Sequence, residues 1–358
     1  MHKLIMHKIK LGITIGDING IGPEVIIKAL SDNKLLKHFT PIIYGSTKVL
    51  AYHKNIVKDS SFNYMAINSL DSVAHGKVNV INCWEGDTNI TLGTASKEGG
   101  QYAIKALEKA TDDLKEGKID GLVTAPINKH SMHLADFPYP GHTEYLSKKL
   151  GQGKSLMMMV SPSLKVALVT NHLAIQEVAE KINKDIIRKK INLLHQTLIQ
   201  DYGIEKPVIA VLGLNPHAGD DGVIGSEEDD FIKPMINEAK RDGKVIMGPY
   251  AADGFFGSAQ FKKPDAILAM YHDQGLIPFK ALSFGSGVNY TAGLDHIRTS
   301  PDHGTGYDIV GKDKADASSM RAAIYLAIDT IRNRRQHISD HSNKMEATAS
   351  KELSREKG

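Results

Sequence analysis

The sequence has a single cysteine, Cys83, and a single tryptophan among its 358 residues. One cysteine excludes a disulfide within the chain and any zinc or iron–sulfur site built from several thiolates. The 44 lysines and arginines nearly balance the 41 aspartates and glutamates, so there is no charge excess of the kind that binds nucleic acid. No apolar run approaches the ~20 residues of a membrane-spanning helix. The first residues lack the apolar stretch of a secretory signal. We therefore expect a cytoplasmic protein that binds neither nucleic acid nor membranes.

The chain alternates short β-branched runs with helical patterns, which is typical of an α/β protein. Its length suits two domains or one large α/β body. Several apolar runs are nearly continuous, as strands buried on both faces must be. The expected strands are residues 9–15, 41–44, 78–81, 119–123, 165–169, 207–212 and 265–269.

Two long segments have helical periodicity. Residues 95–116 and 315–332 each place their apolar side chains on one face, which predicts two amphipathic helices. The last stretch, 336–358, is polar and lacks this periodicity, so we expect a mobile tail there.

No segment carries the G-x-G-x-x-G fingerprint of the common dinucleotide fold. Two glycine pairs, at positions 20 and 22 and at 285 and 287, lack the third glycine because Val25 and Tyr290 stand there. A dinucleotide would therefore have to bind in another way.

The segment Gly16–Glu24, with the sequence GDINGIGPE, lies between an expected strand and a helical pattern. Its glycines allow a tight turn, and a proline followed by Glu24 suits the first turn of a helix. Taken alone, the segment is more typical of a structural strand-to-helix turn. The functional alternative is a loop that lines a ligand cleft at the carboxyl end of the strand.

Three of the sixteen histidines, His172, His217 and His272, follow directly on the ends of expected strands. The carboxyl ends of strands in an open α/β sheet converge on one crevice. Three imidazoles there could hold a divalent metal and leave positions open for a substrate. A lone histidine is more often structural or solvated, but three at equivalent strand ends favour a metal site. Asp273 could orient His272 or take part in proton transfer.

Two further segments carry side chains that suit an anionic ligand. His142 and Thr143 stand at the start of a helical pattern, where Thr143 either caps the helix or holds a polar substrate together with His142. Lys280, Asn289 and Arg298 fall in one loop-rich stretch. Two cations and an amide suit a carboxylate or a phosphate, although any one of them alone could be a surface residue.

The segment 300–311, with the sequence SPDHGTGYDIVG, precedes the last expected helix. It is either a plain connection or a loop that contacts the adenosine side of a dinucleotide.

Together these segments resemble the 4-hydroxythreonine-4-phosphate dehydrogenases of vitamin B6 synthesis, from about residue 11 to about residue 331. The resemblance rests on motifs in one order: GDINGIGPE, TAPINK, PGHTE, NPHAG, YHDQG and DHGT. The family's fold is similar to that of isocitrate and isopropylmalate dehydrogenases. It implies two α/β/α domains with the active-site cleft between them. We expect one domain of residues 1–127 and 282–335, a second of residues 128–281, and the tail 336–358.

The resemblance also implies which residues form the site. The metal ligands would be His172, His217 and His272. The substrate contacts would be His142, Thr143, Lys280, Asn289 and Arg298. The cofactor contacts would be Gly16, Asp17, His303, Gly304 and Thr305. Lys280 and Asp273 are the expected catalytic residues.

The implied enzyme is an oxidoreductase that uses NAD or NADP and one divalent metal, zinc, magnesium or cobalt, per active site. The family's cleft lies at a dimer interface, with one metal histidine from the partner subunit, which implies an obligate homodimer with shared active sites. The implied reaction oxidises 4-hydroxythreonine 4-phosphate to a β-keto acid, which loses CO₂ to give 3-amino-2-oxopropyl phosphate for pyridoxal 5'-phosphate biosynthesis.

Other functions remain open at this point. A sister group with overlapping motifs acts on the 4-phosphates of D-threonate and D-erythronate. Ser286 stands where many relatives have a basic residue, and Gly306 where alanine is usual. From the residues alone, a zinc hydrolase with three histidine ligands or a phosphate-binding sensor is also compatible with the pattern.

Overall fold

The computed structural model of the chain describes residues 8–32, 34–58, 60–151, 154–283 and 285–355, with side chains up to residue 342. These residues form one 12-stranded sheet in the order β3-β4-β2-β1-β5-β12-β11-β6-β7-β10-β8-β9. The strands are β1 Lys10–Thr14, β2 Thr40–Gly45, β3 Tyr64–Ile67, β4 Val78–Asn82, β5 Gly121–Thr124, β6 Leu156–Ser161, β7 Leu164–Leu168, β8 Val208–Leu212, β9 Val245–Tyr250, β10 Ala266–Ala269, β11 Val288–Ala292 and β12 Ile297–Pro301. The expected α/β class is confirmed.

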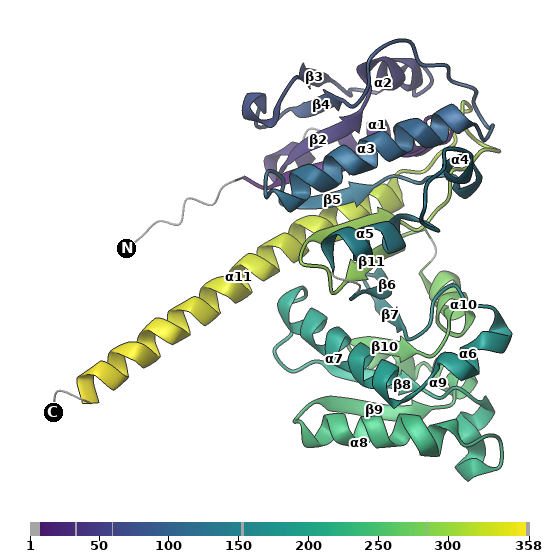
Figure 1. Ribbon diagram of the computed structural model, residues 1–358, viewed down its shortest axis with the longest axis vertical. Helices are drawn as coiled ribbons and strands as arrows, with labels where there is room; N and C mark the ends of the chain where they lie inside the picture. Colours follow the sequence, from purple (N-terminus) through teal and green to yellow (C-terminus); the bar gives the residue numbers. More distant parts are fainter. Residues whose placement is uncertain (1–7, 33, 59, 152–153, 284, 356–358) are drawn as a thin grey trace.

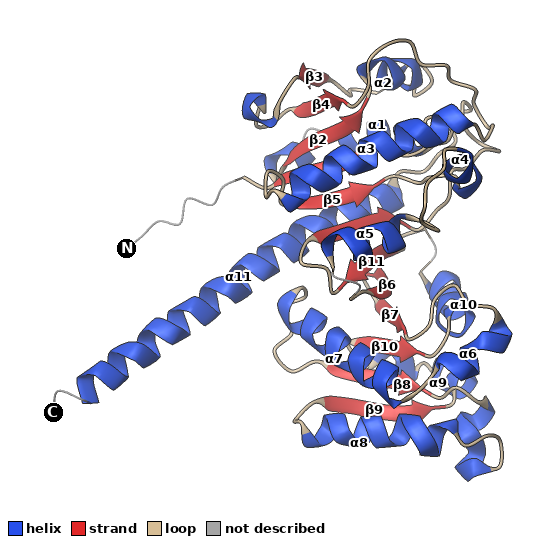
Figure 2. Ribbon diagram, viewed as in Figure 1, coloured by secondary structure: helices blue, strands red, loops and turns tan. Residues whose placement is uncertain are grey.

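The sheet consists of two parallel groups joined by two antiparallel strands. The strands from β3 to β12 in the sheet order are mutually parallel, and so are β7, β10, β8 and β9. Between the groups, β11 and β6 run antiparallel to their neighbours. Where the two groups join, the strands of one group therefore run antiparallel to those of the other. The sheet also twists by about 20–25° from each strand to the next. As a result the arrowheads of β5 and β9 lie at the same side of the molecule (Figure 2).

Helices cover the sheet on its two faces (Figure 1). They are α1 Gly22–Leu30, α2 Thr47–Lys54, α3 Lys97–Lys115, α4 Lys129–Leu134, α5 His142–Leu150, α6 Ile175–Lys181, α7 Lys184–Gln200, α8 Lys233–Arg241, α9 Ala252–Gly257, α10 His272–Leu282 and α11 Ser318–Arg355. Within the described residues, no helix is long and apolar enough to cross a membrane.

All seven expected strands are present, because each is an apolar run whose residues are largely buried. Strands β3, β6, β9, β11 and β12 were not expected. In β11 and β12 the buried positions include the polar residues Thr291, Arg298 and Thr299, which obscure the apolar pattern. The stretch from Lys280 to Arg298 is therefore not a loop-rich segment, as expected, but the end of α10 followed by two strands.

The polar C-terminal segment forms a helix that its sequence pattern did not predict. Residues 336–355 continue α11, whose last turns project away from the rest of the molecule (Figure 1). No proline or glycine interrupts the chain between Asn333 and Arg355, so nothing stops the helix from propagating. One-turn side-chain contacts support it, such as the hydrogen bond from Gln336 Nε2 to Asp340 Oδ1 at 2.8 Å. The mobility of this segment stays a prediction.

The core is one large cluster that follows the sheet and a smaller one at its second half. The smaller cluster includes Met157, Val166, Leu212, Phe255 and Phe279. The division into residues 1–127 with 282–335 and residues 128–281 stays a prediction, since the sheet itself is continuous.

Candidate active site

A pocket of about 240 Å³ lies where the ends of β5 and β12 meet α5 and the segment that follows β7. It brings together residues from both parallel groups, so strand ends do converge on one crevice. The lining residues are Thr124, Ala125, Pro126, Ile127, Lys129, Pro140, Gly141, His142, Thr143, Glu144, Met157, His172, Asn289, Arg298, Ser300, Pro301, His303 and Gly304. Of the expected site residues, His142, Thr143, Asn289, Arg298, His172, His303 and Gly304 are among them.

Arg298 is a buried cation at the floor of this pocket. Its side chain comes from β12, and the residue is 3% exposed. Its guanidinium donates to hydroxyls, to Thr124 Oγ1 at 2.7 and 3.1 Å and to Thr291 Oγ1 at 3.1 Å. In the described part of the chain, no carboxylate forms an ion pair with it. Burial lowers the pKa of Arg298 to about 10, against the opposing effect of Glu144. The guanidinium therefore stays charged near neutral pH and is open to an anionic ligand.

Three side chains of the same pocket carry buried polar atoms without a partner, His142, Asn289 and His303. His142 Nε2 and Asn289 Oδ1 make no hydrogen bond within the residues described. Such atoms cost about 1–3 kcal/mol each when left unsatisfied, so they indicate a ligand that would pair with them. Burial, with a smaller contribution from Arg298, holds the pKa of His142 well below its usual value, and its imidazole is therefore neutral.

The amino end of α5 faces this pocket. The helix is capped by Gly141, without any side-chain hydrogen bond, and His142 is its first residue. The interpretation of Thr143 as the cap is therefore wrong, because the chain turns into the helix before that residue. Thr143 instead lies in the first turn, where backbone N–H groups without helical partners favour negative ligands.

A larger cavity of about 420 Å³ lies between α7 and α11, and charged residues of its wall pair with each other. Arg334 in its wall donates to Asp201 Oδ1 at 2.5 Å, and Tyr290 donates to Asp201 Oδ2 at 2.5 Å. None of the described residues that line it carries a buried polar atom without a partner. The smaller pocket is therefore the better candidate for a ligand site.

The three expected metal histidines follow the neighbouring strands β7, β10 and β8. The rings of His172 and His272 lie 5.6 Å apart, centroid to centroid. Asp273 Oδ1 is 2.7 Å from His272 Nδ1, which leaves the Nε2 atom of that ring for another partner. Glu144 Oε1 lies 3.7 Å from His172 Nδ1, and this neighbour lowers the pKa of Glu144.

His217 lies in a different environment, on an exposed turn from Pro216 to Gly222. Residues 217–221 all have positive φ, between 44° and 86°, a conformation that costs about 1–2 kcal/mol for each residue other than glycine. Glu228, which is 1% exposed, supports the turn by accepting hydrogen bonds from the backbone N–H groups of Leu214 and Asn215 at 2.7 and 2.8 Å. Within the described residues, no group of three His, Cys, Asp or Glu side chains is placed to hold a metal ion.

The expected cofactor residues lie in two loops that pack against each other. Gly16 has a φ of +72°, and a Cβ atom there would approach the carbonyl oxygen of Pro126 to 2.4 Å. Asp17 is 1% exposed and accepts a hydrogen bond from the hydroxyl of Tyr307 at 2.5 Å. The backbone N–H of Ile21 donates to Thr305 O at 2.8 Å. Gly16, Asp17 and Thr305 thus lie where the two loops pack together, whereas His303 and Gly304 line the pocket.

Lys280 is an exposed residue in the last turn of α10 and does not line the pocket. Its positive charge lies close enough to Asp302 to oppose the effect of burial, which raises the pKa of that carboxyl group. Asp302 is next to the pocket residues Pro301 and His303, so Lys280 borders the site. Its catalytic role stays a prediction.

Four pocket residues with polar side chains were not assigned from the sequence: Thr124, Lys129, Glu144 and Ser300. Thr124 and Glu144 stand inside quoted motifs, TAPINK and PGHTE, so those motifs were the available signal. Thr124 and Arg298 lie 174 residues apart in the sequence. No local sequence pattern predicts a contact between residues so far apart.

The family model of the pyridoxal phosphate biosynthetic protein PdxA matches residues 37–327. The chain belongs to this family. The 4-hydroxythreonine-4-phosphate dehydrogenase of Bacteroides thetaiotaomicron is 50% identical over 331 residues, which cover 92% of this chain and 91% of the relative. The solved structure of 4-hydroxythreonine-4-phosphate dehydrogenase from Klebsiella pneumoniae has a TM-score of 0.79 at 32% identity, and the match covers 91% of this chain and 98% of that one.

A third relative bears a different name. A protein of Oceanobacillus iheyensis, provisionally named D-threonate 4-phosphate dehydrogenase, is 40% identical over 322 residues, which cover 89% of this chain and 97% of that protein. The family inferred from the motifs is confirmed, and so is the oxidoreductase class, since these PdxA relatives are named dehydrogenases.

Proposed function

We propose that this protein oxidises 4-hydroxythreonine 4-phosphate with NAD or NADP to a β-keto acid, which loses CO₂ to give 3-amino-2-oxopropyl phosphate in pyridoxal 5'-phosphate biosynthesis. The observation that carries the proposal is one pocket that holds the buried cation Arg298 beside the unsatisfied atoms His142 Nε2 and Asn289 Oδ1. No carboxylate of the described residues forms an ion pair with this arginine. Such a pocket fits a small ligand with an anionic end and several hydroxyl or amine groups. The sequence composition supports a cytoplasmic enzyme.

The chain's own residues would hold and orient this substrate. Arg298 binds an anionic end, because its donors are fixed by Thr124 and Thr291 and need no rearrangement. His142 is neutral and can donate or accept at Nε2, depending on its tautomer, without adding repulsion against Arg298. The amino end of α5 adds backbone donors beside Thr143.

The donor set at the strand ends fits a divalent metal. Two imidazoles bound to one tetrahedral zinc, with Zn–N bonds of about 2.0–2.1 Å, would place their ring centroids roughly 5–6 Å apart, and those of His172 and His272 are 5.6 Å apart. Asp273 fixes the ring of His272 through Nδ1. A bound metal would lower the pKa of the substrate hydroxyl at C3 and so ease its oxidation.

We further propose a homodimer in which His217 completes the site of the other subunit. The pair formed by His172 and His272 belongs to one chain, whereas the described residues of that chain offer no third ligand in a metal-binding group. The alternative arrangement is a dimer in which His272, instead of His217, reaches the site of the other subunit. Mixing His172→Ala and His272→Ala subunits would test that alternative.

Two mixing experiments separate these arrangements. If His217 acts across the dimer, heterodimers of His217→Ala with His172→Ala regain one complete site, and heterodimers of His172→Ala with His272→Ala regain none. If His272 acts across the dimer, only the second mixture recovers. No recovery from either verified heterodimer would contradict shared sites.

The cofactor would contact the loop that carries His303 and Gly304. His303 and Gly304 line the pocket, and His303 Nε2 is a further buried atom without a partner in the described chain. Nδ1 of His303 donates to Gly304 O at 3.0 Å, which leaves Nε2 of the neutral ring as an acceptor, and a ribose hydroxyl of a dinucleotide would donate to it. The bound dinucleotide would accept the hydride released from the substrate.

A second candidate activity is oxidation of D-threonate or D-erythronate 4-phosphate, which is favoured by the name of the Oceanobacillus relative. The two activities differ in whether the substrate carries an ammonium or a hydroxyl group at C2. The test is kcat/KM for each substrate with NAD and with NADP under a defined metal. Reduction of the dinucleotide by neither substrate would contradict the proposal and leave a three-histidine hydrolase or a phosphate sensor.

A further inference from the structure

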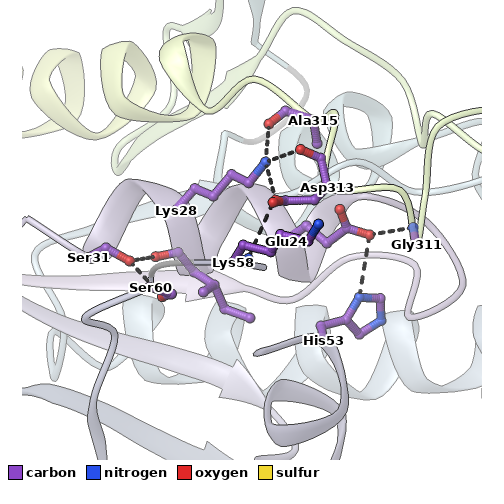
Figure 3. A network of polar contacts seen from close by, with 10 residues as sticks. Glu24, Lys28, Ser31, His53, Lys58, Ser60, Gly311, Asp313 and Ala315 are labelled. Carbon is purple, nitrogen blue, oxygen red and sulfur yellow. Dashed lines mark hydrogen bonds and ion pairs between the residues drawn. The ribbon is translucent and has the colours of Figure 1, made fainter. Parts of the chain in front are cut away.

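The loop from Asp302 to Ala317, which carries His303 and Gly304 into the pocket, is fastened to helix α1 by two side chains outside the pocket. Figure 3 shows Glu24 and Lys28 of α1 directed toward Gly311, Asp313 and Ala315 of this loop. Neither side chain lines the pocket. Their contacts are therefore with the chain itself.

Lys28 holds the far end of the loop through three oxygen atoms. Its Nζ donates to Asp313 O at 3.0 Å and to Ala315 O at 2.8 Å, and it forms an ion pair with Asp313 Oδ1 at 2.8 Å. The lysine lowers the pKa of Asp313 below its usual value. Asp313 has a φ of +56°, a left-handed conformation that is uncommon for residues other than glycine.

Glu24 holds the middle of the loop from a completely buried position. The residue is 0% exposed, and its Oε1 accepts a hydrogen bond from the backbone N–H of Gly311 at 2.8 Å. His53, also 0% exposed, lies 3.8 Å from the same oxygen and is itself held through Nε2 by Ile18 O at 2.9 Å. A buried acidic group is expensive to desolvate, and here it serves as an acceptor for this loop.

The pocket end of the loop is attached to the same segment of the chain. Thr305 O accepts from Ile21 N at 2.8 Å, and Tyr307 donates to Asp17 at 2.5 Å. The loop is thus joined to the segment from Asp17 to Lys28 at regular intervals, beginning directly after His303 and Gly304. Loosening one end would widen the range of positions open to those two residues.

We propose that Lys28 and Glu24 are positioning residues for dinucleotide binding: they hold the Asp302–Ala317 loop in the conformation that the cofactor recognises. The inference rests on the proposed function, since it takes His303 and Gly304 as cofactor contacts. When only part of the population has the competent loop, the apparent Kd rises by the factor by which that fraction falls. Substrate and metal contacts come from other elements and would not change.

The test compares Lys28→Met with a matched control, Lys48→Met, in the full-length protein. Lys48 also contacts a carbonyl and a carboxylate, Gly86 O at 3.1 Å and Asp87 Oδ1 at 2.9 Å, but it fastens a segment that does not line the pocket. Binding of NAD⁺ and of NADP⁺ is measured by calorimetry without substrate, and KM for each reactant and kcat are measured with metal saturating.

Lys28→Met removes all three contacts of this lysine to the loop, and we expect the smaller fraction of competent loop to raise the Kd of the dinucleotide about 5- to 30-fold. The KM of the substrate should stay within about twofold of the wild-type value. Lys28→Arg, which keeps the charge, should recover part of the affinity, and Lys48→Met should bind like the wild type. Because Glu24→Leu could fail to fold, Glu24→Gln serves as the second variant. It keeps an acceptor for Gly311 and should weaken binding less than Lys28→Met.

Wild-type dinucleotide affinity in Lys28→Met, or an equal loss of affinity for dinucleotide and substrate, would overturn the inference. His303→Ala distinguishes this failure from that of the proposed function. If His303→Ala weakens dinucleotide binding and Lys28→Met does not, only the positioning role is wrong. If neither variant changes it, the loop is not the dinucleotide site, and both the cofactor assignment and the inference fall.

Discussion

The anion pocket and the histidine edge of the sheet are built differently. In the pocket, Arg298 is 3% exposed and its donors are already fixed by Thr124 and Thr291. At the histidine edge, the side chains of His172 and His272 are 50% and 35% exposed, and His217 lies on a turn with left-handed backbone. The described residues of one chain thus hold the cation of the pocket in place, but they offer no complete group of metal ligands. If the shared-site dimer proposed above is correct, substrate anchoring belongs to the fold of one subunit, and metal binding depends on assembly.

The largest expected effect falls on the histidine edge. His217→Ala should lose the bound metal and, with it, dehydrogenase activity, because a catalytic site with two protein ligands holds its metal much less tightly. The melting temperature of the metal-free protein should be nearly unchanged, since the substituted side chain is exposed and alanine, which also carries a Cβ atom, leaves the cost of the left-handed turn as it was. Metal analysis of the purified variant is the measurement. Full metal occupancy would contradict the ligand assignment.

Arg298→Met tests the pocket side of the comparison. If Arg298 binds the substrate through charge-assisted hydrogen bonds as proposed, removing this buried cation should lower kcat/KM by about 10³-fold. The metal content should stay normal, because this residue belongs to the other region. Arg298→Lys should recover little, since an ammonium cannot span both threonine hydroxyls and a ligand. A loss of metal in Arg298→Met would erase the distinction between the two regions.

Lys280 lies between the two regions and sharpens their boundary. It is part of α10, which begins at His272, but its charge acts on Asp302 beside the pocket. If Lys280 contacts the substrate, Lys280→Ala should lower kcat/KM roughly 10- to 200-fold, the equivalent of one charge-assisted hydrogen bond. Arginine should rescue poorly. A wild-type kcat/KM with metal and dinucleotide saturating would make Lys280 a surface lysine.

The smallest expected effect is a change in the pH dependence of stability. The pKa of His142 in the folded protein lies well below that of an unfolded histidine, near 6.5, because burial disfavours its charged form. Its contribution to stability is present above pH 6.5 and is lost as the pH falls through the lower, folded pKa, because the unfolded state binds the extra proton. His142→Gln should therefore flatten the curve of unfolding free energy against pH below 6.5. The measurement is urea denaturation over that range, with His130→Gln, at an exposed position in the first turn of α4, as the control.

Many of the strands could be predicted from the sequence, but other elements could not. The continuous apolar runs of β1, β2, β7, β8 and β10 were predictable because each is buried on both faces. By contrast, β12 was interpreted as a loop because an arginine interrupts its apolar pattern. The burial of this arginine is acceptable because threonine hydroxyls of β5 and β11 accept its hydrogen bonds. The tail from residue 336 was judged by its lack of an apolar face, although a helix can extend without one when its residues have adequate helix propensity.

What the amino-acid sequence determined by itself is the α/β class, most of the parallel strands and the kinds of side chain available for chemistry. The tertiary structure decided which of them meet. His142, Asn289 and Arg298 come from α5, β11 and β12, and Arg298 faces Thr124 of β5, 174 residues earlier in the chain. Such meetings follow from strand order, register and twist across the whole sheet. These depend on contacts between distant segments, which no local pattern of residues encodes.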